Sequence, residues 1–118
     1  MAGQYRKRLG YAGEQKAARF LKNKGYTILE HNWRYKNTEI DIIAFDGKKV
    51  IFVEVKRRKT LDFGYPEEAI TASKRQSLRK AAETYLHQRS DNPDIRFDVI
   101  AIWEEEGREK IEHFEDAF

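Results

Sequence analysis

A carboxylate and an amine two residues apart are the groups in this chain most suited to chemistry. Glu54 and Lys56 interrupt an otherwise apolar run, Val50-Ile51-Phe52-Val53-Glu54-Val55-Lys56. Residues two apart in an extended strand point to the same face, so these two side chains project side by side. Charge in a buried strand is costly unless it is paired or bound to a metal. The pair could therefore hold a metal ion and position a water molecule, or form a plain ion pair at a sheet edge.

A second carboxylate, Asp41, lies within the preceding apolar segment, although aspartate is depleted in strands. The dipeptide Asp46-Gly47 predicts a tight hairpin turn between the two segments. A two-residue turn at this dipeptide pairs Phe45 with Lys48. Counting back from that pair makes Asp41 the diagonal neighbour of Glu54 on one sheet face. A three-residue loop would instead place the two carboxylates on opposite faces.

Charges that share one face of a buried hairpin need neutralisation. Lys56 could neutralise Asp41, but Glu54 would then remain an unpaired carboxylate. Two carboxylates this close either shift a pKa or recruit a cation, and a hard divalent ion such as Mg²⁺ prefers carboxylate oxygens. Glu14 lies on the apolar stripe of a predicted helix, where it could join the site or be stabilised by the helix dipole alone. The residues favour a metal site over a structural ion pair.

Hydrophobic periodicity predicts the elements that position these residues. Their order is helix, three strands, helix and strand, an α/β fold with a mixed sheet flanked by helices. Helices are expected at about 10–24 and 71–89, strands at 26–34, 39–45, 48–56 and 95–103, a turn at 35–38, a loop at 57–66 and a short edge strand at 110–114. We expect a single domain over 1–118, with a core at about 9–103 and a C-terminal extension at 104–118.

Composition excludes several functional classes. No apolar run approaches the ~20 residues of a membrane-spanning helix, and the N-terminal residues lack the apolar segment of a signal peptide. The absence of cysteine excludes disulfides and thiolate metal sites and fits a cytoplasmic location. The net charge is +3, and basic clusters at 6–8, 57–59 and 74–80 suit either a phosphate backbone or plain solvated surface. No base-reading motif is present, so any selectivity would be for nucleic-acid shape.

Several ordered motifs resemble the YraN-like family of small bacterial proteins. They are Gly13-Glu14, Asn32-x-Arg34, Glu39-Ile40-Asp41-Ile42-Ile43-Ala44, Phe52-Val53-Glu54-Val55-Lys56-x-Arg58, a helix with Lys74 and Tyr85-Leu86, and Arg96-Phe97-Asp98-Val99. The resemblance covers about 9–102, and one departure is Thr38, where that family usually has glycine. The family is similar in fold to the restriction-endonuclease-like nucleases of the PD-(D/E)xK superfamily, which include archaeal Holliday junction resolvases and share an α-β-β-β-α-β core.

This resemblance implies a metal-dependent endonuclease that hydrolyses phosphodiester bonds of DNA, with branched or junction DNA as a candidate substrate. Asp41, Glu54 and Lys56 would be catalytic, and Glu14, Asp41 and Glu54 would bind Mg²⁺ or Mn²⁺. The side chains expected to contact nucleic acid are Arg34, Arg57, Arg58, Lys59, Lys74, Arg75 and Gln76. The alternative is a catalytically silent nucleic-acid-binding module that retains the nuclease fold.

A nuclease of this kind that cuts two strands of a junction would need a homodimer. The chain offers three apolar candidates for such an interface, Phe63, Tyr65 and Phe118.

Overall fold

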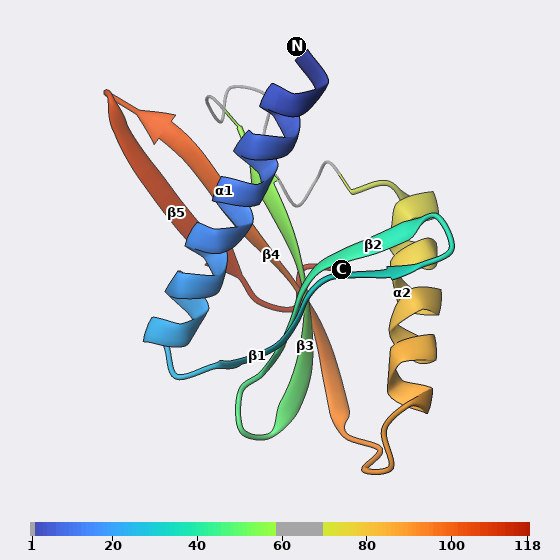
Figure 1. Ribbon diagram of the computed structural model, residues 1–118. Coiled ribbons are helices and arrows are strands. Elements are labelled where there is room, and N and C mark those ends of the chain that lie inside the picture. The colour runs from blue at the N-terminus through green and yellow to red at the C-terminus, as the bar shows by residue number, and fades with distance from the viewer. Residues whose placement is uncertain (1, 59–69) are drawn as a thin grey trace.

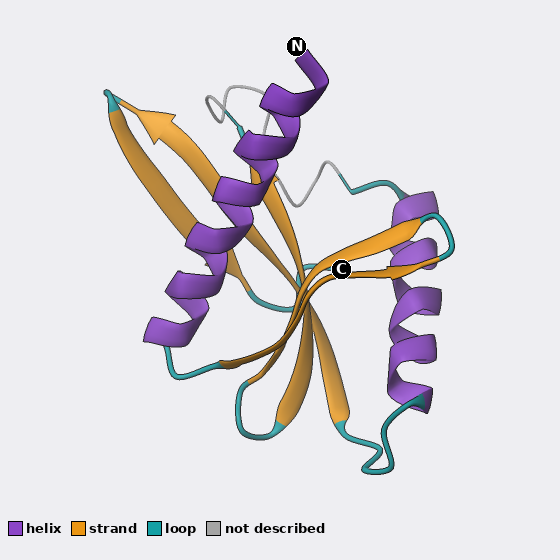
Figure 2. Ribbon diagram, in the orientation of Figure 1, coloured by secondary structure: helices purple, strands orange, loops and turns teal. Residues whose placement is uncertain are grey.

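The computed structural model describes residues 2–58 and 70–118 and shows a mixed five-stranded sheet with one helix on each face (Figures 1 and 2). The elements are α1 (Ala2–Asn23), β1 (Thr27–Tyr35), β2 (Thr38–Phe45), β3 (Lys49–Arg57), α2 (Ala72–His87), β4 (Asp94–Glu105) and β5 (Arg108–Phe114). The strands lie in chain order, and only the β3–β4 pair, joined across α2, is parallel. The predicted α/β class and the α-β-β-β-α-β order are confirmed, and β5 extends the sheet.

The two faces of the sheet carry separate apolar clusters, one under each helix. On the first face, Ala17, Ala18 and Leu21 of α1 are buried against the sheet, as the helical periodicity predicted. On the second face, α2 buries Leu78, Ala81, Ala82 and Tyr85. Both faces of the central strands are therefore covered, which explains their almost continuous apolar sequence.

The hairpin between β2 and β3 differs in register from the sequence prediction. Phe45 pairs with Val50 rather than with Lys48, and the backbone N–H of Asp46 donates to the carbonyl of Lys49 at 3.2 Å. The turn residues are therefore 47–48 rather than 46–47, because Gly47 adopts the left-handed conformation (φ 102°) while the Asp46 carboxylate accepts the backbone N–H groups of residues 48 and 49. The register has moved by two residues, an even number, so the predicted facing of the strands is kept.

Beyond Ile42, β2 separates from β3. Pairing between these strands runs from Phe45–Val50 to Ile42–Val53, while β1 and β2 remain paired as far as Tyr35–Thr38. The end of the β1–β2 hairpin extends toward α2 (Figure 1), and Ile40 packs in the α2-side cluster instead of sharing the α1 side with Ile42. The apolar face of β2 thus changes at Asp41, and the opening between β2 and β3 begins at this residue.

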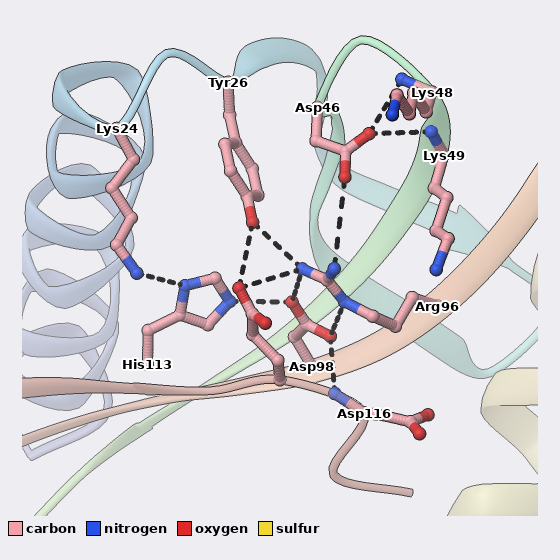
Figure 3. A network of polar contacts seen from close by, with 10 residues as sticks. Lys24, Tyr26, Asp46, Lys48, Lys49, Arg96, Asp98, His113 and Asp116 are labelled. Atoms are coloured by element: carbon pink, nitrogen blue, oxygen red, sulfur yellow. Dashed lines mark hydrogen bonds and ion pairs between the residues drawn. The ribbon is translucent and has the colours of Figure 1, made fainter.

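A buried polar network joins β4 to β5 and to the C-terminal residues (Figure 3). Asp98 is 0% exposed and accepts two hydrogen bonds from Arg96, at 2.8 and 2.7 Å, and one backbone N–H from Asp116 at 3.0 Å. Nε2 of His113 lies 2.7 Å from the same carboxylate. Burial acts to raise the pKa of Asp98, but the bonds from Arg96 and His113 hold it below its ordinary value.

The element boundaries shift at several ends of the predicted segments. The first helix begins at Ala2 rather than near Gly10, β1 continues through Tyr35, and β3 continues through Arg57. The rest of the loop predicted at 57–66 lies almost entirely outside the described residues. Phe118, one of the apolar residues considered for a dimer interface, packs against Phe97 with ring centroids 5.2 Å apart; the other two candidates lie outside the described residues. None of the helices in the described part of the chain is long and apolar enough to cross a membrane.

Candidate metal centre

Three carboxylates from three different elements converge where β2 leaves β3. Glu14 comes from α1, Asp41 from β2 and Glu54 from β3. The β2–β3 pairing ends at Ile42–Val53, and Asp41 and Glu54 are the next residues along the two strands, so they face each other across the point of separation rather than in the diagonal arrangement predicted from the sequence. Asp41 and Glu54 line a cleft of about 430 Å³ together with Asn37, Thr38, Glu39, Thr71, Ser73, Lys74 and Ser77.

Each of these carboxylates has one oxygen held by a protein donor. The donors are Nδ2 of Asn32 for Glu14 at 2.6 Å, the backbone N–H of Val55 for Asp41 at 2.7 Å, and Nζ of Lys74 for Glu54 at 3.1 Å. The second oxygen of Glu54, Oε2, is buried and has no hydrogen-bond partner in the described structure. A buried carboxylate oxygen without a donor is costly unless a cation completes it, so the donor set fits a hard divalent ion.

The acids perturb one another in the absence of a cation. Burial first, and then the charges of Glu54 and Glu14, raise the pKa of Asp41 to about 8, although the Val55 N–H acts in the opposite direction. Burial also raises the pKa of Glu14, with a further increase from the charge of Glu39. A bound divalent cation would remove the need for these protons, because it neutralises the same charges.

Two lysines approach Glu54 from different sides. Nζ of Lys56 lies 3.7 Å from Glu54 Oε1, and Nζ of Lys74, at the start of α2, lies 3.1 Å from the same oxygen. The Lys56 side chain is 16% exposed, and burial lowers its pKa, whereas the Lys74 side chain is 43% exposed and lines the cleft. Lys56 thus sits within the site, while Lys74 is accessible to a ligand in the cleft.

Glu39 is a member of the cluster that the sequence reasoning did not assign to the site. One oxygen of each of Glu14, Glu39 and Asp41 lies within 4.8 Å of the others. The signal was available, because Glu39 and Asp41 are two residues apart on one strand, as Glu54 and Lys56 are. Asn32 was noted only as part of a motif, and its contact with Glu14 has no signal in the local sequence.

The residues predicted to contact nucleic acid differ in their surroundings. Three are engaged in the described structure: Arg34 with Glu39 at 2.9 Å, Arg57 with Glu109 at 3.3 Å, and Arg75 with the carbonyl of Ile70 at 3.2 Å. Lys74 is held at Glu54, and Arg58 and Gln76 are exposed. Lys59 lies outside the described residues.

Comparison of the amino-acid sequence with known proteins places this chain in a family. A family model described as "Uncharacterised protein family UPF0102" matches residues 13–102, which span α1 through most of β4. The chain belongs to the UPF0102 family. This UPF0102 protein therefore carries the whole cluster, from Glu14 to Lys74, inside the family-defining region, and the YraN-like resemblance read from the motifs is confirmed.

Individual UPF0102 relatives match over nearly their full lengths. A UPF0102 protein of Flavobacterium psychrophilum is 46% identical over 110 residues, covering 93% of this chain and 92% of the relative. A UPF0102 protein of Geotalea daltonii is 48% identical over 114 residues, covering 95% and 90%. One from Caldicellulosiruptor saccharolyticus is 48% identical over 99 residues, covering 83% and 84%.

Proposed function

We propose that this protein is a metal-dependent phosphodiesterase that cleaves DNA, with Mg²⁺ or Mn²⁺ held by Glu14, Asp41 and Glu54. The observation that carries the proposal is the unpartnered, buried oxygen of Glu54 in a cleft shared with Asp41. The ion pairs with Lys56 and Lys74 both fall on Oε1 and leave Oε2 without a partner, and buried carboxylate oxygens without a partner are rare. The order of the elements supports the further proposal that the domain is related to the PD-(D/E)xK nucleases.

The cleft offers the groups that such a reaction requires. When bound, a divalent ion supplies Lewis acidity toward the scissile phosphate and lowers the pKa of a coordinated water. Lys56, with its pKa lowered by burial, is placed beside Glu54 to orient the attacking water. Lys74 lines the cleft, and its ammonium can stabilise charge on the phosphate oxygens.

The lining of the cleft indicates which part of a nucleic acid would enter it. Carboxylate, hydroxyl, amide and ammonium groups line the cleft, and no aromatic side chain does so among the described lining residues. Bases are usually held by stacking on aromatic rings, whereas phosphate and sugar need only polar and cationic groups. The substrate is therefore read through its backbone and its shape, as expected for branched or junction DNA.

A cleavage panel tests this function. The protein is incubated with single-stranded, duplex, flap and four-way-junction DNA and with RNA, in Mg²⁺, Mn²⁺ or EDTA. We expect cation-dependent cutting of DNA that falls by about 100-fold or more in Asp41→Asn and Lys56→Ala, because each change removes a group that acts on the reacting phosphate or water.

Matched variants control for non-specific effects. Asp94→Asn and Lys110→Ala make the same changes at exposed strand positions and should cut like the wild type. Binding of DNA without cutting by any of these proteins would reject the enzyme and support the catalytically silent binding module instead.

A further inference from the structure

Asn32 makes a contact that none of the functions above requires. It lies in β1, and its Nδ2 donates to Glu14 Oε2 at 2.6 Å and to Glu39 Oε1 at 2.7 Å. Both hydrogens of one neutral amide are thus used to hold two carboxylates that would otherwise repel each other. A lysine or arginine here would neutralise the acids and weaken their attraction for a cation, whereas an amide orients them and leaves their charge intact.

The backbone of Asn32 is adapted to this role. Its φ is 49°, a left-handed conformation in the middle of a strand that costs most residues energy and is best tolerated by glycine and asparagine. The pairs on either side, His31–Ile42 and Trp33–Ile40, place Asn32 opposite Asp41. The strained conformation therefore turns the amide toward the same opening that begins at Asp41. Strain of this kind persists where surrounding contacts require it, often at functional sites.

Glu39 is held differently from the other acids. Its Oε1 accepts from Asn32 and its Oε2 accepts from Arg34 at 2.9 Å. With both oxygens occupied, Glu39 fixes the Asn32 amide and is less suited to bind an ion than Glu14. The motif Asn32-x-Arg34 and Glu39 thus form one supporting unit behind Glu14.

The hydrogen bonds of the cluster limit how its carboxylates can bind a cation. A donor that fixes one oxygen of a carboxylate sets the orientation of the group and leaves the other oxygen more available to an ion, which favours binding through one oxygen over binding through both. Ca²⁺ takes six to eight oxygen ligands and often uses both oxygens of a carboxylate, whereas Mg²⁺ takes six and completes its shell with water. Glu14, Asp41 and Glu54 each have one oxygen held in this way, so the geometry favours the smaller ion.

We infer that Asn32 is a positioning residue that restricts Glu14 to a single coordinating oxygen and so selects Mg²⁺ or Mn²⁺ over Ca²⁺. This inference rests on the proposed function only in that the site binds a divalent cation. It assigns a role to a side chain that touches neither the ion nor the substrate. Supporting residues of this kind commonly contribute 10- to 100-fold to metal affinity.

Calorimetric titration of the full chain with Mg²⁺, Mn²⁺ and Ca²⁺ tests the inference without any nucleic acid. Asn32→Gly keeps the left-handed backbone accessible and deletes the amide. We expect Mg²⁺ and Mn²⁺ to bind roughly 10- to 100-fold more weakly to this variant, with Ca²⁺ affected less, so that the preference between the ions moves toward Ca²⁺ by about tenfold. An unchanged preference, or a wild-type protein that binds none of the ions, would overturn the inference.

Two further variants isolate the amide. Asn92→Gly makes the same change at another residue with positive φ (20°), in the turn before β4, and should titrate like the wild type. Asn32→Asp keeps the size of the side chain and its tolerance of the left-handed conformation but offers no donor, so it should shift the preference in the same direction as Asn32→Gly. A wild-type preference in Asn32→Asp would show that the donated bonds are not responsible.

The outcome for this inference is separable from the outcome for the nuclease. A wild-type protein that selects Mg²⁺ but cuts no nucleic acid would reject the enzyme and keep the role of Asn32. A protein that cuts DNA while Asn32→Gly retains the wild-type ion preference would do the reverse.

Discussion

The carboxylate of Asp41 accepts a favourable hydrogen bond but lies buried beside other acidic groups. It accepts the Val55 N–H at 2.7 Å, yet burial and the neighbouring acids raise its pKa to about 8 from an ordinary 3.8. The folded protein therefore keeps a proton on this group that the unfolded chain releases above pH 4. The stabilisation from that proton is complete below pH 3.8 and is lost as the pH rises through 8. The ionised Asp41 side chain, without a bound cation, thus destabilises the folded protein at alkaline pH.

Replacing Asp41 by asparagine should make the protein more stable. The amide oxygen can still accept the Val55 N–H, while the repulsion from Glu14 and Glu54 is gone. We expect the free energy of unfolding at pH 8.5, without divalent ions, to rise on the order of 2 kcal/mol in Asp41→Asn. The gain should shrink as the pH falls toward 4. Urea denaturation across this pH range measures it.

Two comparisons separate this effect from a general change of charge. Asp94→Asn removes an exposed carboxylate and should change stability by less than about 0.5 kcal/mol at either pH. Saturating Mg²⁺ should raise the melting temperature of the wild type but not that of Asp41→Asn, because only the wild type keeps the full ligand set. Equal stability of wild type and Asp41→Asn at pH 8.5 would contradict the expectation that the buried, ionised Asp41 carboxylate destabilises the fold.

At the scale of elements, substitution of one glycine in the β2–β3 hairpin and one in α1 should change the stability of the protein in opposite directions. Gly47 has a φ of 102°, with nothing within 4 Å of where a Cβ would lie, so Gly47→Ala should cost about 1 kcal/mol through backbone strain alone. Gly13 lies in α1, where an added Cβ would meet Arg57 at 3.6 Å in an ordinary contact. Gly13→Ala should therefore stabilise the protein by about 0.5–1 kcal/mol.

The opposite signs of these two changes are the informative result. Chemical denaturation of both variants measures them under one set of conditions. A loss of stability in Gly13→Ala would show that α1 packs more tightly against β3 than the contact distances indicate.

The elements were predictable from the sequence because most of them are set by local patterns. The apolar stripes of α1 and α2 and the runs of β2, β3 and β4 specified the α-β-β-β-α-β order. The predicted hairpin turn was wrong by one residue and the strand register by two, because Asp46 accepts the following backbone N–H groups through its side chain while Gly47 provides the left-handed turn. The prediction that Asp41 and Glu54 share one face of the sheet remained correct, because the register shift was an even number of residues.

The site was only partly predictable, for a reason that is also physical. Asp41, Glu54 and Lys56 lie on neighbouring strands, so strand periodicity brings them together. Glu14 approaches from a helix: its place on the apolar stripe allowed it to join the site, and the motif resemblance then implied that it binds the ion. Asn32 was missed because a left-handed residue inside a strand depends on tertiary contacts that no local pattern encodes.

At the scale of the whole molecule, the network around Asp98 joins β4 to β5 and to Tyr26, which follows α1. Arg96 donates to Asp98 and also to the hydroxyl of Tyr26 at 2.9 Å, while His113 brings in β5. This network holds together segments from both halves of the chain (Figure 3). Its buried charges are all paired, whereas the candidate metal centre leaves one buried carboxylate oxygen, Oε2 of Glu54, without a hydrogen-bond partner in the described structure.

Removing the charge of Asp98 should destabilise the protein without affecting ion binding. Asp98→Asn removes the nearest acidic partner of Arg96, whose side chain is only 14% exposed, and leaves it with Glu115 at 3.6 Å and Asp46 at 3.9 Å. We expect a loss of about 3 kcal/mol in the free energy of unfolding at pH 7. Because the folded pKa of Asp98 is lowered, this contribution is present above about pH 4 and is lost on further acidification. Thermal and urea unfolding measure the change.

Asp91 provides a matched control for Asp98. It pairs with Arg89 at the same 2.7 Å, but its side chain is 55% exposed. Asp91→Asn should therefore cost much less stability than Asp98→Asn. If both variants lose the same stability, or if Asp98→Asn weakens Mg²⁺ binding, then the network and the metal centre are not independent.

The parting of β2 and β3 has a practical consequence for inactive forms of this protein. Asp41 lines the cleft and also accepts the backbone N–H of Val55, so the proposed metal ligand has a second, structural role at the end of the β2–β3 pairing. Alanine at this position would remove the carboxylate and also leave the Val55 N–H without its hydrogen-bond acceptor. A loss of activity in Asp41→Ala could then result from disorder of β3 rather than from loss of the metal ligand. Asparagine keeps an oxygen that can accept the Val55 N–H but removes the negative charge that the proposed reaction requires. An Asp41→Asn protein is therefore the form in which to capture an uncut nucleic acid.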